Sequence, residues 1–502
     1  MPNKKYILAI DQGTTSSRAV LFDTDFKIIG IEQHESRQIF PKPGWVEQDA
    51  VEIWEAQLFV MRNLINRLNI NPKDILTIGI TNQRETSIVW NKKTGKPIYN
   101  AIIWQDRRTA AYCEDLKQKG YLQAIYKKTG LLIDSYFSAT KIKWILDEVP
   151  KARKMAENEE LLFGTVDSWL IWNLSGGKKH VSDITNASRT MLFDIHKQDW
   201  DDDLLSLMNI PKSMMPKVID SSGVFAETAL GLLGDIKVPI SGCAGDQQAA
   251  LFGQACFKEG MVKNTYGTGC FMLMNTGKEP KFSKNGLLTT IAWKINGETT
   301  YAIEGSVFVA GAAIKWLRDG LKLFREATDT EAMAKSVPDS GGVIVVPAFA
   351  GLGAPYWNMN ARGAVFGITQ GVNEKHIIRA TLESLAYQTK DVLEAMKTDT
   401  EINPEMIKAD GGACVNNFLM QFQSDILGTQ VLRPEIIEST ALGAAYLAAL
   451  AMEIINIDQI AENQKHDKLF SPQISTTEQN KLYSEWKRAV RAVLTWVEET
   501  ES

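Results

Sequence analysis

Short apolar runs separated by polar turns mark the first hundred residues. Residues 6–10 and 19–23 are apolar and enclose a run of glycine and hydroxyl residues, which is the pattern of a β-hairpin. Residues 28–32 predict a third strand and residues 76–81 a fourth. Apolar positions in residues 51–68 recur at the spacing of an amphipathic helix. Strands that alternate with helices favour an α/β fold in which helices cover the sheets.

The second half of the chain repeats this theme. Two apolar runs, residues 261–266 and 270–275, flank a Gly-Thr-Gly turn, and residues 407–410 lead into a glycine pair and a helix from Asn417. Coincidence is the alternative, because glycine and polar residues are common in turns. The length of 502 residues favours a true repeat, since an ordinary domain holds about 100–200 residues. We therefore expect two related lobes, and a cleft between lobes is a usual place for ligands.

Composition and charge narrow the class of protein. Hydrophobic residues make up 44% and charged residues 23%, which is close to the average globular protein and excludes disorder or a coiled coil as the main state. Lys+Arg total 55 and Asp+Glu 60, so the net charge of −5 argues against general binding of nucleic acid or anionic membranes. The most apolar run, residues 441–452, is shorter than the ~20 residues that span a bilayer and predicts a buried helix rich in alanine.

The cysteines and the N-terminus bear on the cellular compartment. The five cysteines are odd in number and show no zinc-ligand spacing, so we expect reduced thiols and no disulfide framework. The first residues lack the apolar stretch and cleavage site of a signal peptide. The sequence therefore predicts a cytoplasmic protein without membrane insertion.

The turn at residues 11–18 has the chemistry of an anion site. Its sequence is Asp-Gln-Gly-Thr-Thr-Ser-Ser-Arg. Free backbone N–H groups, hydroxyls and Arg18 can donate to a polyphosphate, and glycine lets the backbone approach it. Asp11 would repel phosphate unless a Mg²⁺ ion lay between them. A plain polar hairpin turn is the alternative. The P-loop and the G-x-G-x-x-G motif are absent, so ATP would need another cradle.

Three further features of the sequence each allow a functional and a structural interpretation. Asp246 stands where an apolar strand ends and a helix begins, and can either cap the helix or accept a proton from an attacking hydroxyl. Arg84 and Glu85 follow a strand, where neighbours point to opposite faces, so both can face one ligand only if the chain turns there. They could bracket a polyol with Trp104 as an apolar wall. Taken alone, these residues favour a surface ion pair and a core tryptophan. The glycine-rich turns of the second half suit a nucleotide, or are ordinary loops.

Longer motifs carry a resemblance to a known family. Nearly end to end, from about residue 4 to 490, the chain resembles the FGGY carbohydrate kinases, and among them the bacterial members that act on glycerol. The stretches that carry it are residues 9–18, 41–47, 79–85, 95–101, 244–248 and 264–271. Residues 136–144 are similar to the first family signature, and residues 363–368 with 376–383 to the second.

The resemblance implies a fold and a reaction. The fold has two lobes, each with an RNase-H-like core of mixed sheet flanked by helices, as in actin and Hsp70, with the active site in the cleft between them. Residues 1–254 form the N-terminal lobe with the polyol site, and residues 255–502 the C-terminal lobe with much of the nucleotide site. The implied reaction is ATP-dependent phosphorylation of glycerol to sn-glycerol 3-phosphate with Mg²⁺, by a homodimer or homotetramer.

The resemblance also assigns site residues. The substrate contacts it implies are Arg84, Glu85, Trp104, Tyr136, Asp246, Gln247 and Phe271. Asp246 takes the place of the family's general base, and Asp11 that of the carboxylate on the Mg²⁺ side. The nucleotide contacts it implies are Thr14, Thr15, Ser16, Arg18, Thr268, Gly311, Lys315, Gly412 and Asn416.

The chain departs from the family pattern in two places. Lys315 replaces a glutamine that is common at this nucleotide-side position. The loop at 231–237, which binds fructose 1,6-bisphosphate in some relatives, has Lys237 where arginine is typical, so we do not expect strong inhibition. Residues 220–240 contain no histidine, so activation by histidine phosphorylation is not expected either. The rival hypotheses are a kinase for another polyol or a pentulose, an ATPase switch like Hsp70, and an inactive regulator.

Overall fold

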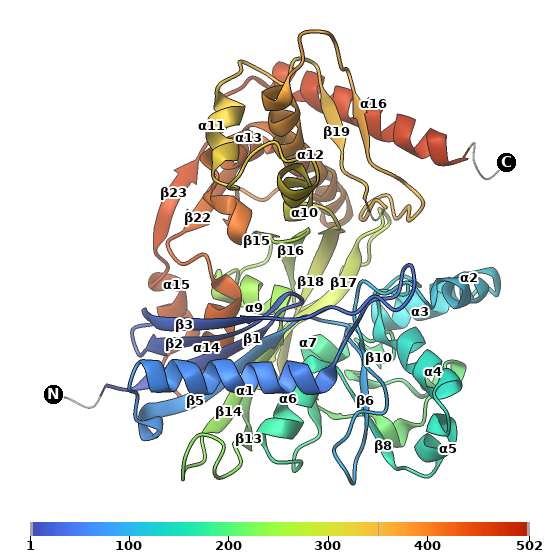
Figure 1. Cartoon of the computed structure of the whole chain (residues 1–502), viewed down its shortest axis with the longest axis vertical. Coiled ribbons are helices and arrows are strands. Elements are labelled where there is room, and N and C mark those ends of the chain that lie inside the picture. The colour runs from blue at the N-terminus through green and yellow to red at the C-terminus, as the bar shows by residue number, and fades with distance from the viewer. Residues whose placement is uncertain (1–3, 350, 499–502) are drawn as a thin grey trace. The chain divides into compact units, whose positions relative to one another are not determined.

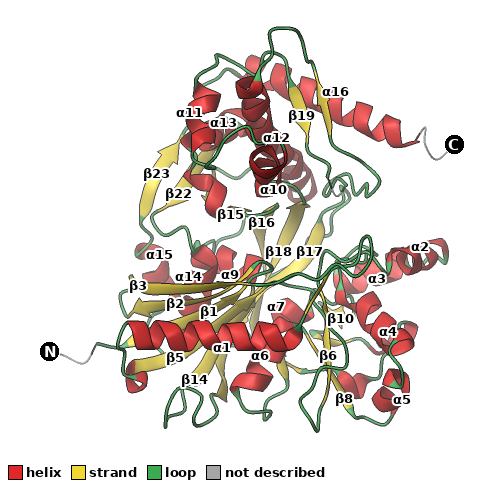
Figure 2. Ribbon diagram, in the orientation of Figure 1, coloured by secondary structure: helices red, strands yellow, loops and turns green. Residues whose placement is uncertain are grey.

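The computed structural model describes residues 4–349 and 351–498. The chain divides into two compact units. The first comprises Met1–Ala255, Thr289–Tyr301 and Thr440–Asn463, and the second comprises Cys256–Leu288, Ala302–Ser439 and Gln464–Ser502. Strands and helices are mixed in both units, which confirms the predicted α/β class (Figure 2).

The first unit is built on a mixed sheet with the strand order β17-β13-β14-β5-β1-β2-β3. The strands are β1 (Tyr6–Gln12), β2 (Ser16–Asp23), β3 (Ile28–Glu35), β5 (Ile75–Asn82), β13 (Ser222–Glu227), β14 (Pro239–Gly245) and β17 (Leu288–Ile295). β1 pairs antiparallel with β2, and β2 pairs antiparallel with β3. β5 is parallel to β1, and β14 is parallel to β5, so the carboxyl ends of these three strands lie at one edge.

Helices cover this sheet closely. α1 (Ala50–Arg67) lies across the sheet and packs on β2 and β3 (Figure 1). Its buried residues recur at helical spacing. The Asp49 side chain accepts a hydrogen bond from the backbone of Val51 and so caps the helix. α14 (Ser439–Ala451) is the predicted alanine-rich helix. It lies so near β5 that a methyl group at Gly79 would overlap the carbonyl of Ala444, which explains the small residues on both sides.

Smaller elements complete the first unit. Its other helices are α2 (Ala110–Gln118), α3 (Leu122–Thr129), α4 (Ser138–Glu148), α5 (Ala152–Glu157), α6 (Val166–Leu174), α7 (Ile184–Ala187), α8 (Asp202–Leu207), α9 (Asp246–Gly253) and α15 (Ile457–Glu462). Its short strand pairs are β4 (Glu47–Gln48) with β7 (Ala101–Ile102), β6 (Ile88–Asn91) with β8 (Leu161–Gly164), β9 (Val181–Asp183) with β12 (Lys217–Ile219), and β10 (Phe193–Asp194) with β11 (Asp199–Trp200).

The second unit has its strands in the order β23-β22-β21-β15-β16-β18, and only the first four residues of β18 belong to the first unit. The strands are β15 (Val262–Tyr266), β16 (Cys270–Gly277), β18 (Glu298–Val307), β21 (Met406–Asp410), β22 (Gln430–Pro434) and β23 (His466–Phe470), and a separate hairpin joins β19 (Ile344–Val346) to β20 (Ala364–Phe366). The helices are α10 (Gly311–Lys315), α11 (Asp329–Lys335), α12 (Glu374–Thr400), α13 (Asn417–Leu427) and α16 (Thr476–Glu498). α12 and α13 pack side by side against a continuous apolar core.

The two sheets share one plan, which confirms the predicted repeat. In the first unit an antiparallel pair, β1 and β2, has two parallel strands, β5 and β14, on the other side of β1. In the second unit β15 and β16 form the antiparallel pair, and β21 and β22 are the parallel strands beside β15. Each sheet then adds an antiparallel strand, β13 or β23. The glycine and threonine turns therefore occupy equivalent places, between the first two strands of each sheet.

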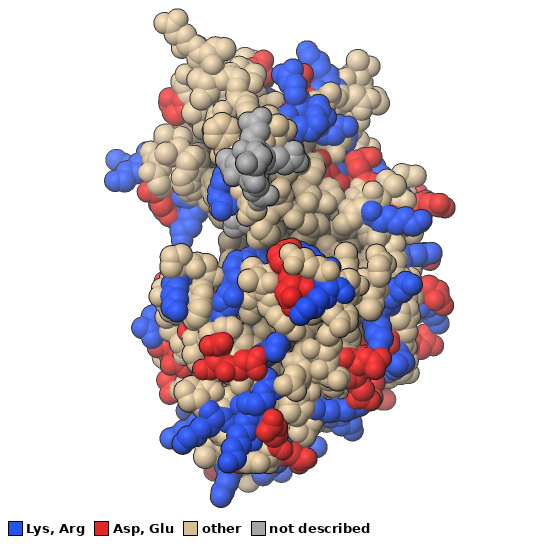
Figure 3. Space-filling model, turned by 90° about the vertical axis from the view of Figure 1, so that its right-hand side faces the viewer, with Lys and Arg blue, Asp and Glu red and all other residues tan. Residues whose placement is uncertain are grey.

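Surface charge, helix hydrophobicity and the cysteines entered the expectations from the sequence, and the structure describes each of them. On the face drawn in Figure 3, Lys and Arg side chains are interspersed with Asp and Glu. Within the described ranges, no helix combines the length and the apolar character needed to span a bilayer. All five cysteines are free and buried.

Candidate active site

A tight turn after β5 brings Arg84 and Glu85 together. Glu85 has φ 61°, in the left-handed region, and the N–H of Thr86 donates to the carbonyl of Arg84 at 2.7 Å. This is the turn that the sequence requires if both side chains are to face one ligand. Arg84 Nε lies 3.9 Å from Glu85 Oε1, and the two side chains are only 2% and 1% exposed. The surface ion pair that the residues alone favoured is therefore wrong.

Asp246 joins this pair from the next parallel strand. It is the first residue of α9, and its Oδ1 lies 3.2 Å from Arg84 Nε. Gly245 occupies the N-cap position and has no side chain, and Asp246 Oδ1 accepts the backbone N–H of Gln247 in the first turn, so the Asp246 carboxylate supports the start of the helix as well as lying beside Arg84. The Asp246 side chain remains 28% exposed, whereas that of Arg84 is buried. A guanidinium thus lies beside a carboxylate that a ligand can reach.

Two aromatic residues adjoin the charged group. Arg84 Nη2 donates to the Tyr136 hydroxyl at 3.4 Å. The ring of Tyr136 meets that of Trp104 edge to face, with 5.7 Å between ring centroids. Trp104 is half-buried, and its Nε1 donates to Thr14 Oγ1 at 2.8 Å. Trp104 therefore connects the charged cluster to the turn between β1 and β2, and is not an ordinary core residue.

The remaining two predicted substrate residues lie in different units. Gln247 follows Asp246 in α9 and is buried, and its backbone N–H donates to Asp246 Oδ1 at 2.8 Å. Phe271 is half-buried on β16 in the second unit, where its carbonyl accepts from Lys263 Nζ at 3.2 Å. The first unit thus brings six of the seven predicted substrate residues into adjoining turns, helices and loops.

Sequence reasoning missed three residues that support this cluster. Arg189 Nε donates to Glu85 Oε1 at 2.7 Å, and both side chains are buried. Gln248 Oε1 accepts from Arg84 Nη1 at 3.2 Å. Lys141, on α4, is fully buried, and burial lowers the pKa of its ammonium to about 7. Lys141 lies within the stretch similar to the first family signature and could have been found there, whereas local sequence gives no signal for Arg189.

The turn between β1 and β2 is compact. The N–H of Gly13 donates to the carbonyl of Ser16 at 2.9 Å, which leaves Thr15 exposed at the tip and Thr14 half-buried. Ser16 is buried, at the start of β2. Gln48 Nε2 holds the carbonyl of Thr14 at 2.9 Å. Such a turn presents hydroxyls and backbone N–H groups to a ligand.

Two charged residues face each other at the base of this turn. Asp11, at the end of β1, is 8% exposed and is the register partner of half-buried Arg18 on β2. Opposite charges across an antiparallel pair stabilise it. The arrangement offers a carboxylate for a hydrated cation and a guanidinium for phosphate oxygens at one end of the hairpin.

The predicted nucleotide residues of the second unit gather at the ends of β15 and β21. The backbone N–H of Gly311, at the start of α10, donates to the carbonyl of Gly267 at 3.0 Å, next to Thr268. A side chain at Gly411 would overlap the backbone of Tyr266, so the turn that carries Gly412 also lies against this end of β15. Asn416 Oδ1 accepts from the N–H of Leu419 at 3.0 Å and caps α13.

Thr268, Lys315 and Gly412 are the exposed members of this group. Lys315 is exposed in the last turn of α10. Gly412 is exposed too, and a methyl group there would meet nothing within 4 Å. All three positions are exposed and are therefore available to a ligand.

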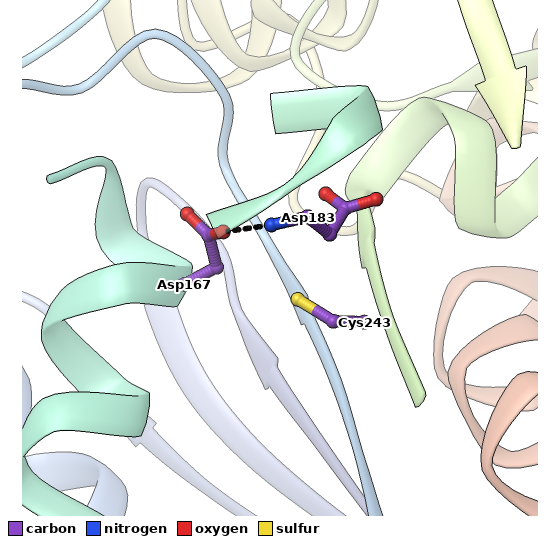
Figure 4. Close-up of side chains that lie close together, drawn as sticks. All are labelled: Asp167, Asp183 and Cys243. Atoms are coloured by element: carbon purple, nitrogen blue, oxygen red, sulfur yellow. Dashed lines mark hydrogen bonds between the residues drawn. The ribbon is translucent and has the colours of Figure 1, made fainter. Parts of the chain in front are cut away.

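A buried group of Asp167, Asp183 and Cys243 lies close to the end of β14, the strand that carries Cys243 (Figure 4). Its geometry could hold a metal ion, but protein donors already occupy the carboxylates. Asp183 accepts from the backbone N–H groups of Thr185 and Asn186, at 3.0 and 2.9 Å, and caps α7. Burial and the neighbouring Asp167 carboxylate raise the pKa of Asp183 to about 7. The group therefore serves the local fold.

The group connects to the candidate site through Thr185. Thr185 Oγ1 donates to Asp183 Oδ1 at 2.8 Å and accepts the N–H of Gly245 at 2.8 Å. Gly245 directly precedes Asp246. The buried carboxylate thus helps to fix the strand end from which Asp246 projects.

Comparisons with known proteins agree with this arrangement. The N-terminal domain of the FGGY family of carbohydrate kinases matches residues 6–253, and the C-terminal domain matches residues 262–452. The chain is 59% identical over 493 residues to glycerol kinase 2 of Thermotoga maritima, covering 98% of this chain and 99% of that protein. It is 60% identical over 499 residues to the glycerol kinase of Alkaliphilus oremlandii, with 99% of both covered.

Solved structures share the fold. A crystal structure of Plasmodium falciparum glycerol kinase with ADP is 36% identical, has a TM-score of 0.90, and is matched over 98% of both chains. A xylulose kinase from Lactobacillus acidophilus shares the fold, with a TM-score of 0.88 at 24% identity over 99% of this chain and 100% of that one. By its two domain matches and its full-length relatives, the chain belongs to the FGGY family of carbohydrate kinases.

Proposed function

We propose that this protein phosphorylates glycerol with ATP and yields sn-glycerol 3-phosphate and ADP. The observation that carries the proposal is the left-handed turn that places buried Arg84 and Glu85 beside the accessible carboxylate of Asp246. Relatives about 60% identical over nearly the whole chain are glycerol kinases, which supports glycerol over a larger sugar.

The cluster suits a small polyol. Arg84 can donate to one hydroxyl and Glu85 can accept from another, while the rings of Trp104 and Tyr136 line the carbon chain. A ligand that left either charged group unpaired would bind poorly, because a buried polar group without a partner is costly. By resemblance, Gln247 and Phe271 add further contacts.

Asp246 is the proposed general base. Its carboxylate can take the proton of the glycerol hydroxyl that attacks the γ-phosphorus, and a positioned base of this kind contributes about 10²–10⁴-fold. The O–H bond of glycerol breaks, a new bond joins its oxygen to phosphorus, and the bond from phosphorus to the ADP oxygen breaks. Most of the remaining acceleration in phosphoryl transfer comes from position and charge neutralisation.

Mg-ATP is the proposed second substrate. Thr14, Thr15, Ser16 and Arg18 would contact the phosphates through the compact turn of the first unit. Asp11 fits a Mg²⁺ ion that keeps most of its waters, because this ion is commonly held by one or two carboxylates together with phosphate oxygens. When bound, Mg²⁺ neutralises phosphate charge. By resemblance, the nucleotide also contacts Thr268, Gly311, Lys315, Gly412 and Asn416, and the protein is a homodimer or homotetramer.

The test is ADP release from Mg-ATP with and without glycerol. We expect turnover that depends on glycerol, and a fall of about 10²–10⁴-fold in kcat/KM for Asp246→Asn. Asp25→Asn is the matched control, since Asp25 is exposed in the turn after β2 and should leave the rate unchanged. ATP turnover indifferent to glycerol would refute the proposal, as would a substrate panel led by a pentulose.

A further inference from the structure

The backbone of Glu85 is held in a conformation that its sequence does not favour. A non-glycine residue at φ 61° lies in the sparsely populated left-handed region, and such residues persist only where the surrounding structure fixes them. Glutamate offers no local compensation of the kind that asparagine or glycine gives at this φ. The fixing contacts must therefore come from elsewhere in the fold.

Three donors meet on the Glu85 carbonyl oxygen. Ser87 Oγ, Ser138 Oγ and Lys141 Nζ donate to it at 3.2, 3.0 and 3.1 Å. Ser138 and Lys141 both belong to α4, more than 50 residues along the chain from Glu85. One face of α4 thus clamps the peptide that follows the Arg84–Glu85 turn.

Lys141 also holds the second wall of the cluster. Its Nζ donates to the carbonyl of Tyr136 at 2.6 Å, so a single ammonium connects the main chains of Glu85 and Tyr136. An ammonium has three donors, and even the neutral amine keeps two, enough for both carbonyls. The contact therefore survives deprotonation of this buried lysine.

The use of a lysine here points to a specific task. Buried lysines are rare and costly, and an apolar residue would pack such a position at lower cost. The charged groups that face Lys141 are Glu85, Asp106, Arg107 and Asp134. Yet the hydrogen bonds of its ammonium go to the carbonyls of Glu85 and Tyr136.

The geometry points to Lys141 as a positioning residue for the polyol site: its ammonium fixes the Glu85 and Tyr136 main chains so that the Arg84, Glu85 and Tyr136 side chains converge on one ligand. The inference rests on the proposed function, since it concerns affinity for the polyol. Lys141 itself need not touch the ligand. Loss of its contacts should weaken glycerol binding much more than ATP binding, because its two acceptors belong to residues of the polyol cluster.

The test is Lys141→Met, which keeps a long unbranched side chain and removes the donors. We expect KM for glycerol to rise by about 10-fold or more, since hydrogen bonds to a charged group are lost, while KM for ATP stays within about 2-fold. Lys143→Met is the matched control on the same helix. Lys143 pairs with Asp147 at 2.7 Å near the surface, so all kinetic constants should stay within about 2-fold.

A second variant covers the case in which Lys141→Met does not fold. Ser138→Ala removes one of the three donors to the Glu85 carbonyl and should raise KM for glycerol by about 3-fold without changing KM for ATP. Folding is monitored by thermal denaturation, and glycerol binding by calorimetry.

The outcomes separate this inference from the proposed function. If the wild-type protein shows no glycerol-dependent turnover, the proposed function fails first. If the wild type is active and the folded variants keep the wild-type KM for glycerol, the positioning role is refuted. Equal loss of affinity for glycerol and ATP, in step with lower thermal stability, would show a purely structural role and would also overturn it.

Discussion

Replacement of Arg189 by methionine tests how much the buried ion pair behind the candidate site stabilises the fold. Arg189 Nε lies 2.7 Å from Glu85 Oε1, and these side chains are 0% and 1% exposed. The variant removes one charge and leaves the Glu85 carboxylate buried. Arg84 Nε, at 3.9 Å, gives only partial compensation.

The expected magnitude follows from burial and distance. At about 4 Å between charges and an effective dielectric constant of about 20, the attraction is about 4 kcal/mol. Removal of one partner from a buried pair typically costs about 3–5 kcal/mol. Because Arg84 remains beside Glu85, we expect Arg189→Met to lower the free energy of unfolding by about 3 kcal/mol.

Arg37→Met supplies the matched control. Arg37 Nη2 also lies 2.7 Å from a carboxylate, that of Glu52, but the side chains are 66% and 46% exposed. An exposed pair contributes about 0–1 kcal/mol. Equilibrium unfolding in guanidinium chloride compares the two variants, and because both pairs lie in the first unit, both report on the same transition.

A third variant isolates the buried charge. Addition of Glu85→Gln to Arg189→Met neutralises the carboxylate and should restore at least about 1 kcal/mol of the lost free energy. The reasoning is refuted if Arg189→Met costs no more than Arg37→Met. It is refuted equally if the double variant is no more stable than Arg189→Met alone.

Two further changes probe close packing and a buried carboxylate. Gly443→Ala would drive a methyl group into the carbonyl of Ala249 and should lower the free energy of unfolding by about 1–3 kcal/mol. Gly371→Ala is the control, because a methyl group there meets nothing within 4 Å and should leave the melting temperature unchanged. Calorimetry measures both variants. Asp391 accepts from Trp486 Nε1 at 2.7 Å, so Asp391→Ala should speed hydrogen exchange in α16. Burial raises the pKa of Asp391 from 3.8 to about 6, so the folded state holds the proton more tightly than the unfolded state. The stability of the wild type should therefore fall as pH rises between these two values. Asp391→Ala should lose this pH dependence of stability, which denaturation curves at several pH values measure.

Local sequence was sufficient for most elements. The periodicity of residues 51–68 predicted α1 to within one residue at each end, and Asn417 is indeed the first residue of α13. The turn at 11–18 predicted the β1–β2 hairpin, although β1 ends two residues later and β2 begins three residues earlier than predicted. These features depend on neighbours in the chain: side-chain spacing, glycine conformations and caps. The long motifs likewise led to the correct family. The assigned roles at the site stay predictions.

Tertiary structure decided what the residues do together. From local chemistry Asp246 could equally cap a helix, and only the approach of Arg84 shows that its carboxylate faces the cluster. Arg189 meets Glu85 across 104 residues, and Trp104 meets Thr14 across 90. Nothing in the glutamate at position 85 favours a left-handed turn; α4 imposes it from outside. Helical periodicity and turn chemistry depend on residues that are near neighbours in the chain, so the sequence alone determined the helices, strands and turns. A buried charge contacts its partner only after the sheet and helices have packed, so the tertiary structure determined the candidate site.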